Sequence, residues 1–449
     1  MGKKSKSSGT TVMKKFELHD ALREAERCLL CHDAPCSVGC AAGTDPGKFI
    51  RQLRFRNIKG AARTVRKNNI LGGVCARVCP TCKLCVERCS RTGIDRPIMI
   101  NSIQQFLADY QNEQNVEVFD KPKSLKTKIA VVGSGPAGLA CAAELALKGY
   151  DVTVLEKDAQ PGGVLAWGIP FYRLDRETLR NDIEAVEKLG VRIKCKAKVS
   201  GKDAIAKLFK EGYAAVYMAT GLTKPGRPRL DGGDLKNVYT AYDFLSMVND
   251  EKLRPKIKTA LAKKNVVVVG GGSVAMDCAT SAKYLGANRV YALSLEALNE
   301  LPADSEEIEL AHKYHVIFKP STQVTKIGGK TGSVCCVMGN EIEWKVPNKF
   351  VPDNAKAVKC TEFSVRADIV VFAIGSRAGE DTIELASGAK ITLQANNLIK
   401  ASDKGATSAK NIFAGGDVVT GGRTVASAVH DGKTAAEAIH SNLSKGGRK

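Results

Sequence analysis

The sequence predicts an α/β protein with a small all-α domain at its N-terminus followed by two domains of the Rossmann type. The first observation is that nine of the fifteen cysteines lie between Cys28 and Cys89, where apolar residues recur at helical spacing. The second is that two units of strand, glycine-rich turn and helix follow, with their first glycines at Gly133 and Gly270. The length of 449 residues accommodates roughly two to four domains of ordinary size.

Composition excludes several classes of protein. A hydrophobic content of 44% is sufficient for large cores, and no run approaches the ~18 apolar residues that cross a bilayer. The N-terminal segment is polar and rich in lysine, so we expect no secretory signal. Cysteines gathered in one segment are atypical of a secreted disulfide scaffold. We therefore expect a cytoplasmic protein with no membrane association.

The N-terminal third divides into a tail, a helical domain and a linker. Residues 1–17 are expected to form a disordered basic tail, and residues 18–118 a helical domain. Within that domain, helical spacing of apolar residues predicts four helices broken by cysteine-bearing loops: Leu18–Leu30, Pro46–Asn57, Gly60–Asn68 and Ile98–Tyr110. Residues 111–127 are polar and are expected to act as a linker.

The first glycine motif lies between a short buried strand, Lys128–Gly133, and an apolar helix that runs through Lys148. A second strand, Asp151–Leu155, ends in an acid, Glu156, as in a dinucleotide-binding fingerprint. Each glycine has a separate reason: one permits the tight turn, one lets the backbone approach a pyrophosphate, and one lets helix and strand pack closely. The predicted binding residues are Gly133, Ser134, Gly135, Pro136, Ala137, Glu156 and Lys157.

The second glycine motif has the same context, beginning at Asn265, and carries Ala275 in the third place, which the fingerprint allows. Two dinucleotide sites in one chain indicate that one nucleotide donates electrons to the other. Buried strands are also expected within residues 366–376 and 411–419, and a helix over Thr424–Leu443. The predicted residues of the second turn are Gly270, Gly271, Gly272, Ser273 and Val274.

Two further glycine segments indicate that the first site holds a flavin. Gly163 closes a Pro-Gly-Gly segment after the first unit, and Gly416 precedes Asp417 at the end of a late strand. Backbone amides and a carboxylate in that position can fix a ribityl chain. We expect Gly163, Gly416, Asp417 and the following Thr424 to contribute to an FAD site.

The cysteine segment indicates iron–sulfur clusters. Its thiols stand mostly two to four residues apart, with one histidine, His32, between them. Structural zinc sites use four thiolates or imidazoles, usually as paired CxxC motifs, and remain an alternative. Nine thiols suit two [4Fe–4S] cubanes better, and then at least one cysteine is not a ligand.

Four segments give the sequence a specific resemblance. Arg27–Cys36, Thr44–Ile50, Cys75–Pro80 and Pro97–Phe106 resemble the N-terminal portion of dihydropyrimidine dehydrogenase, and equally the separate small subunit of its bacterial two-chain form. The glutamate synthase small subunit is a more distant relative with the same layout. The resemblance extends from about Leu18 to about His440.

This resemblance implies a ligand set for each cluster and a domain order. One cluster would be held by Cys28, Cys31, Cys36 and Cys89, and the other by Cys40, Cys79, Cys85 and the side chain of Gln104. Cys75 and Cys82 would then be spectators. The NAD(P)-binding domain, residues 259–374, would be inserted between the two parts of the FAD-binding domain, residues 126–258 and 375–449. Arg173 is expected near the flavin, and Ala373 and Gly375 near the nicotinamide.

The nucleotide turn departs from the pattern of relatives that use NADPH. Those relatives carry arginine just after the second strand of the unit, whereas this chain reads Ser294-Leu295-Glu296. An acid repels a 2′-phosphate and can hold a 2′-hydroxyl, so NADH is favoured over NADPH. Arg289 and Lys283 are the cations that could compensate.

The sequence therefore predicts an NAD(P)H-dependent flavin and iron–sulfur oxidoreductase that delivers electrons to a partner, either a separate catalytic subunit or an acidic electron carrier. Hydride transfer to flavin is cofactor chemistry, so no catalytic side chain is predicted.

A glutamate synthase small subunit or a stand-alone reductase of a soluble carrier remain alternatives. A disulfide reductase is disfavoured because no CxxC follows the first glycine motif. The net charge of +21 suggests nucleic acid as a rival partner, but no nucleic-acid motif supports it. An oligomer is possible.

Overall fold

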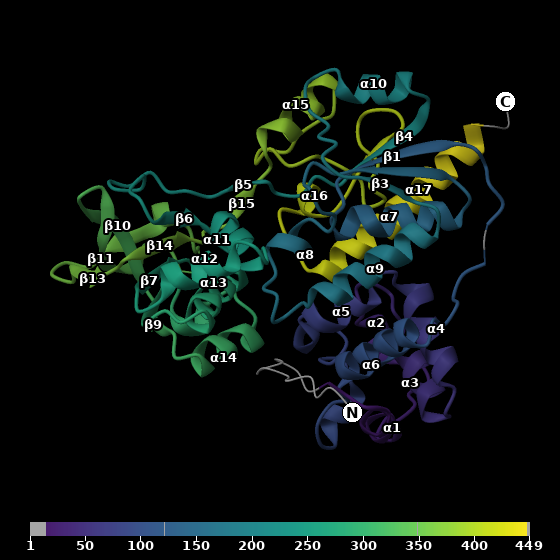
Figure 1. Cartoon of the computed structure of the whole chain (residues 1–449), viewed down its shortest axis with the longest axis horizontal. Coiled ribbons are helices and arrows are strands. Elements are labelled where there is room, and N and C mark those ends of the chain that lie inside the picture. Colours follow the sequence, from purple (N-terminus) through teal and green to yellow (C-terminus); the bar gives the residue numbers. More distant parts are fainter. Residues whose placement is uncertain (1–14, 121, 348, 447–449) are drawn as a thin grey trace. The chain divides into compact units, whose positions relative to one another are not determined.

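The computed structural model describes residues 15–120, 122–347 and 349–446, and it divides into two compact units (Figure 1). The first unit contains the chain up to Ala166, Tyr172–Leu222 and the chain from Ala378. The second contains Trp167–Phe171 and Thr223–Arg377. The second unit is thus inserted in the chain between two parts of the first. The predicted tail lies almost wholly outside the described residues.

Short helices form the cysteine-rich part of the first unit. Prolines begin α2 and α3, and the side chains of Asp45 and Asn57 accept hydrogen bonds from the first turns of α3 and α4. Phe49, Ile103 and Leu107 are fully buried between them. The helices are α1 (Leu18–Glu26), α2 (Pro35–Val38), α3 (Pro46–Arg54), α4 (Ile58–Asn68), α5 (Gly72–Val78) and α6 (Ile100–Glu113), with the 3₁₀ turns η1 (Thr81–Lys83) and η2 (Ser90–Gly93).

The first helix is shorter than its apolar pattern predicts. It ends at Glu26 rather than at Leu30, because the residues that follow turn away and Leu30 has a positive φ of 55°. This turn brings Cys28 and Cys31 out of helical spacing. The loop, rather than a helix, therefore presents the first two cysteines.

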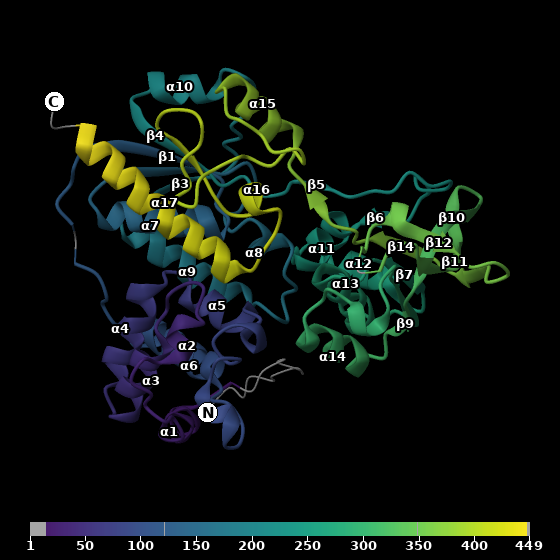
Figure 2. The same ribbon diagram turned by 180° about the vertical axis from the view of Figure 1, so that it is seen from behind.

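A parallel five-stranded sheet forms the rest of the first unit, in the order β16-β4-β1-β2-β3. Its strands are β1 (Lys128–Val132), β2 (Asp151–Leu155), β3 (Arg192–Lys194), β4 (Tyr213–Met218) and β16 (Ile412–Ala414). The apolar helix α7 (Pro136–Leu147) packs along the long C-terminal helix α17 (Val425–Gly446), as both views show (Figure 2). The remaining helices are α8 (Val164–Trp167), α9 (Arg176–Lys188), α10 (Ala204–Lys210), α15 (Glu380–Gly388) and α16 (Asp417–Thr420).

The second unit contains its own parallel sheet, in the order β6-β14-β7-β8-β9. The strands are β6 (Val238–Thr240), β7 (Asn265–Val269), β8 (Arg289–Leu293), β9 (Ile317–Lys319) and β14 (Ile369–Phe372). Its helices are α11 (Ala241–Asn249), α12 (Arg254–Leu261), α13 (Ser273–Tyr284) and α14 (Ser305–Lys313), with η3 (Leu298–Glu300). An antiparallel sheet adds β10 (Thr322–Lys330), β11 (Ser333–Trp344), β12 (Ala355–Ala357) and β13 (Phe363–Arg366), with η4 (Pro352–Asn354), and β5 (Lys224–Pro225) pairs with β15 (Ser376–Arg377).

The boundary of the second unit differs from the expected one. The expected start at residue 259 falls inside α12, whereas the unit already includes residues from Thr223 onward. The physical reason is that β6 pairs with β14 in the same sheet and α11 follows it directly. Among the described residues, no helix has the length and apolar character needed to cross a membrane.

Candidate functional site

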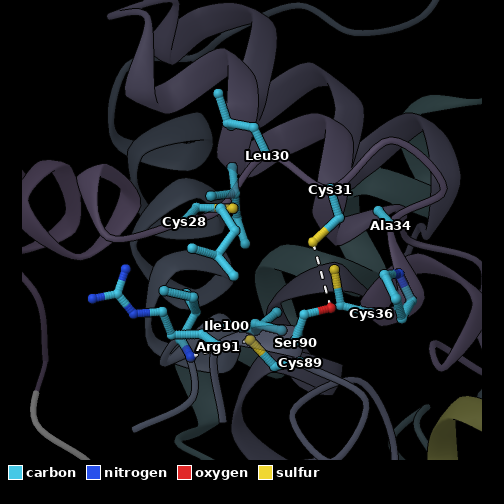
Figure 3. Close-up of a pocket in the computed structure, with 14 residues that line it drawn as sticks. Cys28, Leu30, Cys31, Ala34, Cys36, Cys89, Ser90, Arg91 and Ile100 are labelled. Carbon is cyan, nitrogen blue, oxygen red and sulfur yellow. Dashed lines mark hydrogen bonds between the residues drawn. The ribbon is translucent and has the colours of Figure 1, made fainter. Parts of the chain in front are cut away.

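Four of the predicted cluster cysteines surround one pocket in the cysteine-rich helices (Figure 3). Cys28 and Cys31 come from the loop after α1, Cys36 from α2, and Cys89 from the turn before η2. The Sγ of Cys31 lies 3.5 Å from Ser90 Oγ, and the backbone N–H of Ile98 donates to Cys89 Sγ over 3.5 Å. The structure therefore brings together the whole of the first predicted ligand set.

The thiols of this pocket are crowded and poorly solvated. Burial, together with the neighbouring thiols of Cys28 and Cys89, raises the pKa of Cys36 to about 11. Burial also raises the pKa of Cys28, although Arg54 opposes the shift, and the Arg54 guanidinium donates to the Cys28 carbonyl over 2.5 Å. Four thiols in an apolar pocket fit a cluster that binds them as thiolates and supplies the balancing positive charge.

A second group of thiols forms beside α5. Cys79 lies within hydrogen-bonding reach of Cys75, which raises its pKa together with burial and with Cys40 and Cys85. Burial raises the pKa of Cys85 to about 12, again with Cys40 as a neighbour. The structure thus brings Cys40, Cys79 and Cys85 together, and it adds Cys75, which was expected to be a spectator, to the same neighbourhood.

Gln104, the predicted fourth ligand of this second group, is buried in α6 with 7% of its surface exposed. Its amide nitrogen donates to the carbonyl of Gly72 over 2.8 Å, so its oxygen is the atom left to bind a metal. Among the described residues, no three His, Cys, Asp or Glu side chains are close enough to hold a single ion. A [4Fe–4S] cluster takes each ligand on a different iron atom and does not need such convergence.

The first glycine turn has the geometry of a pyrophosphate cradle. At Gly133, where φ is +102°, a Cβ would lie 2.4 Å from the carbonyl oxygen of Ala219. At Gly138 it would lie 2.0 Å from the carbonyl oxygen of Gly133, because strand and helix pack closely there. At Gly135 nothing lies within 4 Å of that position. The turn is therefore open only at the glycine where a phosphate would approach, in front of the N-terminus of α7.

Glu156 is fixed against this turn. Its Oε2 accepts from the backbone N–H of Ser134 over 2.9 Å and from the Ser134 hydroxyl over 2.5 Å, and its side chain is buried. Ser134 Oγ in turn accepts from the N–H of Gly162 over 3.0 Å. A Cβ on Gly163 would lie 3.1 Å from Gly135 Cα, so the second glycine segment also lies against the first turn.

The late Gly-Asp loop meets the same turn. Gly416 has φ +75° and ψ −158°, and a Cβ there would lie 2.9 Å from the Cβ of Ala137. Asp431, from α17, holds this loop by accepting the N–H of Gly416 over 3.0 Å. Asp417 accepts from the backbone N–H of Arg423 over 3.2 Å, and burial raises its pKa. Sequence reasoning missed Asp431, which stands fifteen positions from its partner and belongs to no motif.

Three other residues predicted to bind the cofactor, Thr424, Arg173 and Lys157, lie in different surroundings. The Thr424 hydroxyl accepts the N–H of Ser427 over 3.1 Å, so it caps the start of α17. Arg173 lies half-buried in the first unit, just before α9. Lys157 is exposed. The cofactor roles of these residues remain predictions.

The second glycine turn repeats the geometry of the first inside the second unit. At Gly270, with φ +140°, a Cβ would lie 2.3 Å from the carbonyl oxygen of Ala373, whereas at Gly272 nothing lies within 4 Å. A Cβ on Gly271 would lie 2.8 Å from the Oε2 of Glu296. The carboxylate of Glu296 is therefore beside the turn, as Glu156 is beside the first. Gly375 has φ +91° and accepts the N–H of Gly226 over 2.8 Å.

The two cations that could compensate, Arg289 and Lys283, lie at the other end of the strands from the glycine turn. Arg289 is the first residue of β8 and pairs with Asn265, the first residue of β7, whereas the glycine turn follows the last residue of β7. A five-residue strand spans about 13 Å at ~3.3 Å per residue. Lys283 Nζ donates to the carbonyl of Asn288, the residue just before β8, over 2.9 Å. Neither side chain lies at the turn.

Comparison with known proteins agrees with this geometry. The family described as pyridine nucleotide-disulphide oxidoreductase matches residues 127–432, and the family described as dihydropyrimidine dehydrogenase domain II, 4Fe-4S cluster, matches residues 5–116. The NAD-dependent dihydropyrimidine dehydrogenase subunit PreT of Salmonella typhimurium is 40% identical over 94% of both chains. The chain belongs to the family of these subunits.

A second relative and a solved structure widen the comparison. The NADP(+)-dependent formate dehydrogenase subunit beta of Moorella thermoacetica is 34% identical over 92% of this chain and 60% of its own. The structure of Mycobacterium tuberculosis FprA in complex with NADPH shares the fold, with a TM-score of 0.59 and 17% identity over 72% of this chain and 85% of that one. The family makes this chain an NAD(P)H-dependent flavin and iron–sulfur oxidoreductase that transfers electrons as a subunit.

Proposed function

We propose that the chain is the electron-input subunit of a dihydropyrimidine dehydrogenase, and that it oxidises NADH with one FAD and two [4Fe–4S] clusters. The observation that carries the proposal is that one compact unit holds both the open first glycine turn and the complete four-cysteine pocket. The relatives named as NAD-dependent dihydropyrimidine dehydrogenase subunits support the assignment to this enzyme.

The cofactors would be held by the residues already described. FAD would lie on the turn of Gly133 and Gly135, with Glu156 toward a ribose and the Gly416–Asp417 loop toward the ribityl chain. One cluster would be bound by Cys28, Cys31, Cys36 and Cys89, and the other by Cys40, Cys79, Cys85 and Gln104. When bound, these groups supply the conversion of hydride chemistry into single-electron transfer.

Preference for NADH follows from the charges at the second turn. The Glu296 carboxylate beside Gly271 can accept from the hydroxyls of an adenosine ribose and would repel a 2′-phosphate. Arg289 and Lys283 lie at the amino-terminal end of β8, away from the turn, and supply no cation there. Lys319 ends the neighbouring strand β9, but its ammonium lies 4.3 Å from the ring centre of Phe363.

The partner would be a separate subunit that reduces the pyrimidine. The cysteine-rich residues 28–110 include thirteen Lys and Arg against five Asp and Glu, which suits an acidic docking surface on that partner.

The test is anaerobic turnover of the purified chain with NADH. The chain alone should reduce an artificial acceptor but form no dihydrouracil from uracil. Dihydrouracil should appear, in step with NADH oxidation, when the pyrimidine-reducing subunit is added. Dihydrouracil formed by the single chain would contradict the proposal. Electron transfer between this chain and a formate-oxidising subunit, with none to the pyrimidine-reducing subunit, would instead group the chain with the formate dehydrogenase subunits.

A further inference from the structure

Lys433 of α17 reaches the cysteine-rich part of the first unit. Its Nζ donates to the carbonyl of Ala42 over 3.1 Å and to the carbonyl of Asn68, the last residue of α4, over 2.6 Å. Glu144 of α7 also faces it: burial raises the pKa of that carboxyl, and Lys433 opposes the shift. The lysine is thus a half-buried cation held by two backbone carbonyls and a neighbouring acid.

The carbonyl of Ala42 belongs to the turn that carries Cys40. Within this turn, the N–H of Gly43 donates to the Cys40 carbonyl over 2.9 Å, and the N–H of Thr44 donates to Cys40 Sγ over 3.3 Å. The Asn68 side chain donates to the carbonyl of Thr44 over 3.1 Å, and the Asn68 carbonyl accepts from Lys433. Asn68 and Lys433 therefore both hold the turn that carries Cys40. The lysine therefore fixes the backbone whose N–H contacts the sulfur of Cys40.

The same helix also holds the flavin loop. Asp431, two residues before Lys433, accepts the N–H of Gly416 over 3.0 Å. One turn of α17 thus contacts the loop that would hold the ribityl chain and the turn that carries a predicted ligand of the second cluster. Helix α17 also contacts α5, which is followed directly by Cys79, another predicted ligand (Figure 2).

We propose that Lys433 is a positioning residue for the second cluster, which it holds at a fixed place relative to the flavin and whose reduction potential it raises. The inference rests on the proposed function, because it requires that Cys40 and Cys79 bind a cluster. The charge of a nearby cation and hydrogen bonds to cluster sulfurs both favour the more negative, reduced state. Loss of the lysine removes the charge and frees the turn that provides the N–H contact.

The variants are Lys433→Met, Lys433→Gln and the conservative Lys433→Arg, with Lys148→Met as the matched control. Lys148 is also a half-buried lysine of the α7–α17 pair, but its ammonium contacts Glu437 at 2.6 Å rather than the cysteine-rich segment. Redox titration followed by EPR gives the potential of each cluster. Rapid-freeze EPR after mixing with NADH gives the rate at which electrons reach the second cluster.

In Lys433→Met and Lys433→Gln we expect a tenfold or greater shift of the reduction equilibrium of one cluster, which is about 59 mV to lower potential for one electron. The other cluster and the rate of flavin reduction by NADH should not change, and electrons should reach the second cluster at least tenfold more slowly. Lys433→Arg should keep both the potential of the cluster and the rate of electron transfer to it close to the wild-type values. Lys148→Met should match the wild type in both.

Hydrogen exchange in the peptide that spans residues 40–46 provides a readout independent of the cofactors, and it should be faster in Lys433→Met. Wild-type potentials, transfer rates and exchange in both neutral variants would overturn the inference. If instead the wild-type chain contains one cluster only, or its flavin is not reduced by NADH, the proposed function fails.

Discussion

Replacement of Glu296 by Gln should weaken the preference for NADH. The carboxylate lies beside Gly271 at the second glycine turn, 2.8 Å from where a Cβ on that glycine would be. A hydrogen bond to a charged group contributes about 1.5–3 kcal/mol, and 1.4 kcal/mol is about tenfold. Loss of the charge should therefore lower kcat/KM for NADH by about tenfold.

The same change should improve the use of NADPH. A carboxylate and a phosphate charge about 4 Å apart repel by about 1 kcal/mol in water and by more where solvent is partly excluded, so removing the charge should raise kcat/KM for NADPH by about fivefold or more. The ratio of the two constants should then move by about fiftyfold, and Leu295→Arg should move it further toward NADPH.

Steady-state kinetics with both nucleotides, using an artificial acceptor, measures this ratio. Glu309→Gln is the control, because it removes an exposed acid from α14 of the same unit. A wild type that prefers NADPH, or a ratio that Glu296→Gln leaves unchanged, would refute the placement of the ribose beside Glu296.

Three further predictions concern cofactor loading and stability. Cys85→Ser should lower the iron content by about half, since it removes a ligand of one of two clusters, whereas iron analysis of Cys82→Ser should match the wild type. Asp182→Ala should destabilise the first unit by about 3–5 kcal/mol in denaturant unfolding, because it leaves the charge of the buried Arg66 guanidinium, 2.6 Å away, without a carboxylate to balance it; an unchanged midpoint would contradict this. Asp175→Asn retains the cap of α9 but loses the Arg77 ion pair, at 3.0 Å. Despite burial, the Thr178 N–H and Arg77 hold the pKa of Asp175 below its usual value, so its stabilisation is present above about pH 4 and is lost in acid. The variant should therefore be slightly less stable than wild type at pH 7 and equally stable near pH 2, and a constant difference across that range would be inconsistent with the ion pair.

The sequence predicted the glycine turns because their chemistry is local. Gly133 and Gly270 each lie in a tight turn between a strand and the helix that follows it directly in the sequence. Glu156 and Glu296 lie just after the next strand, so the lengths of one helix and one strand predict their positions beside the turns. The first cysteine pocket was also accessible, but only through resemblance. Spacing alone does not indicate that Cys89 joins Cys28 and Cys31 across about sixty residues.

The contacts that join the cysteine-rich helices to the flavin-binding sheet could not be predicted in this way. Asp182 receives the N–H of Val74 over 2.8 Å and the Arg66 guanidinium, and Lys433 reaches back to Ala42. Each pair is separated by more than one hundred positions and has no motif, so only the packing of α9 and α17 reveals it. The start of the second unit was missed for a similar reason, because the three-residue strand β6 is too short to give a periodic signal.

The most direct test of the account is an anaerobic reductive titration of the purified chain that counts electrons per FAD. We expect an uptake of about four electrons, two by the flavin and one by each cluster, together with about eight iron atoms per FAD. An uptake of two or three electrons, iron near four, or zinc in place of iron would contradict the central claim that one chain links a flavin to two iron–sulfur clusters.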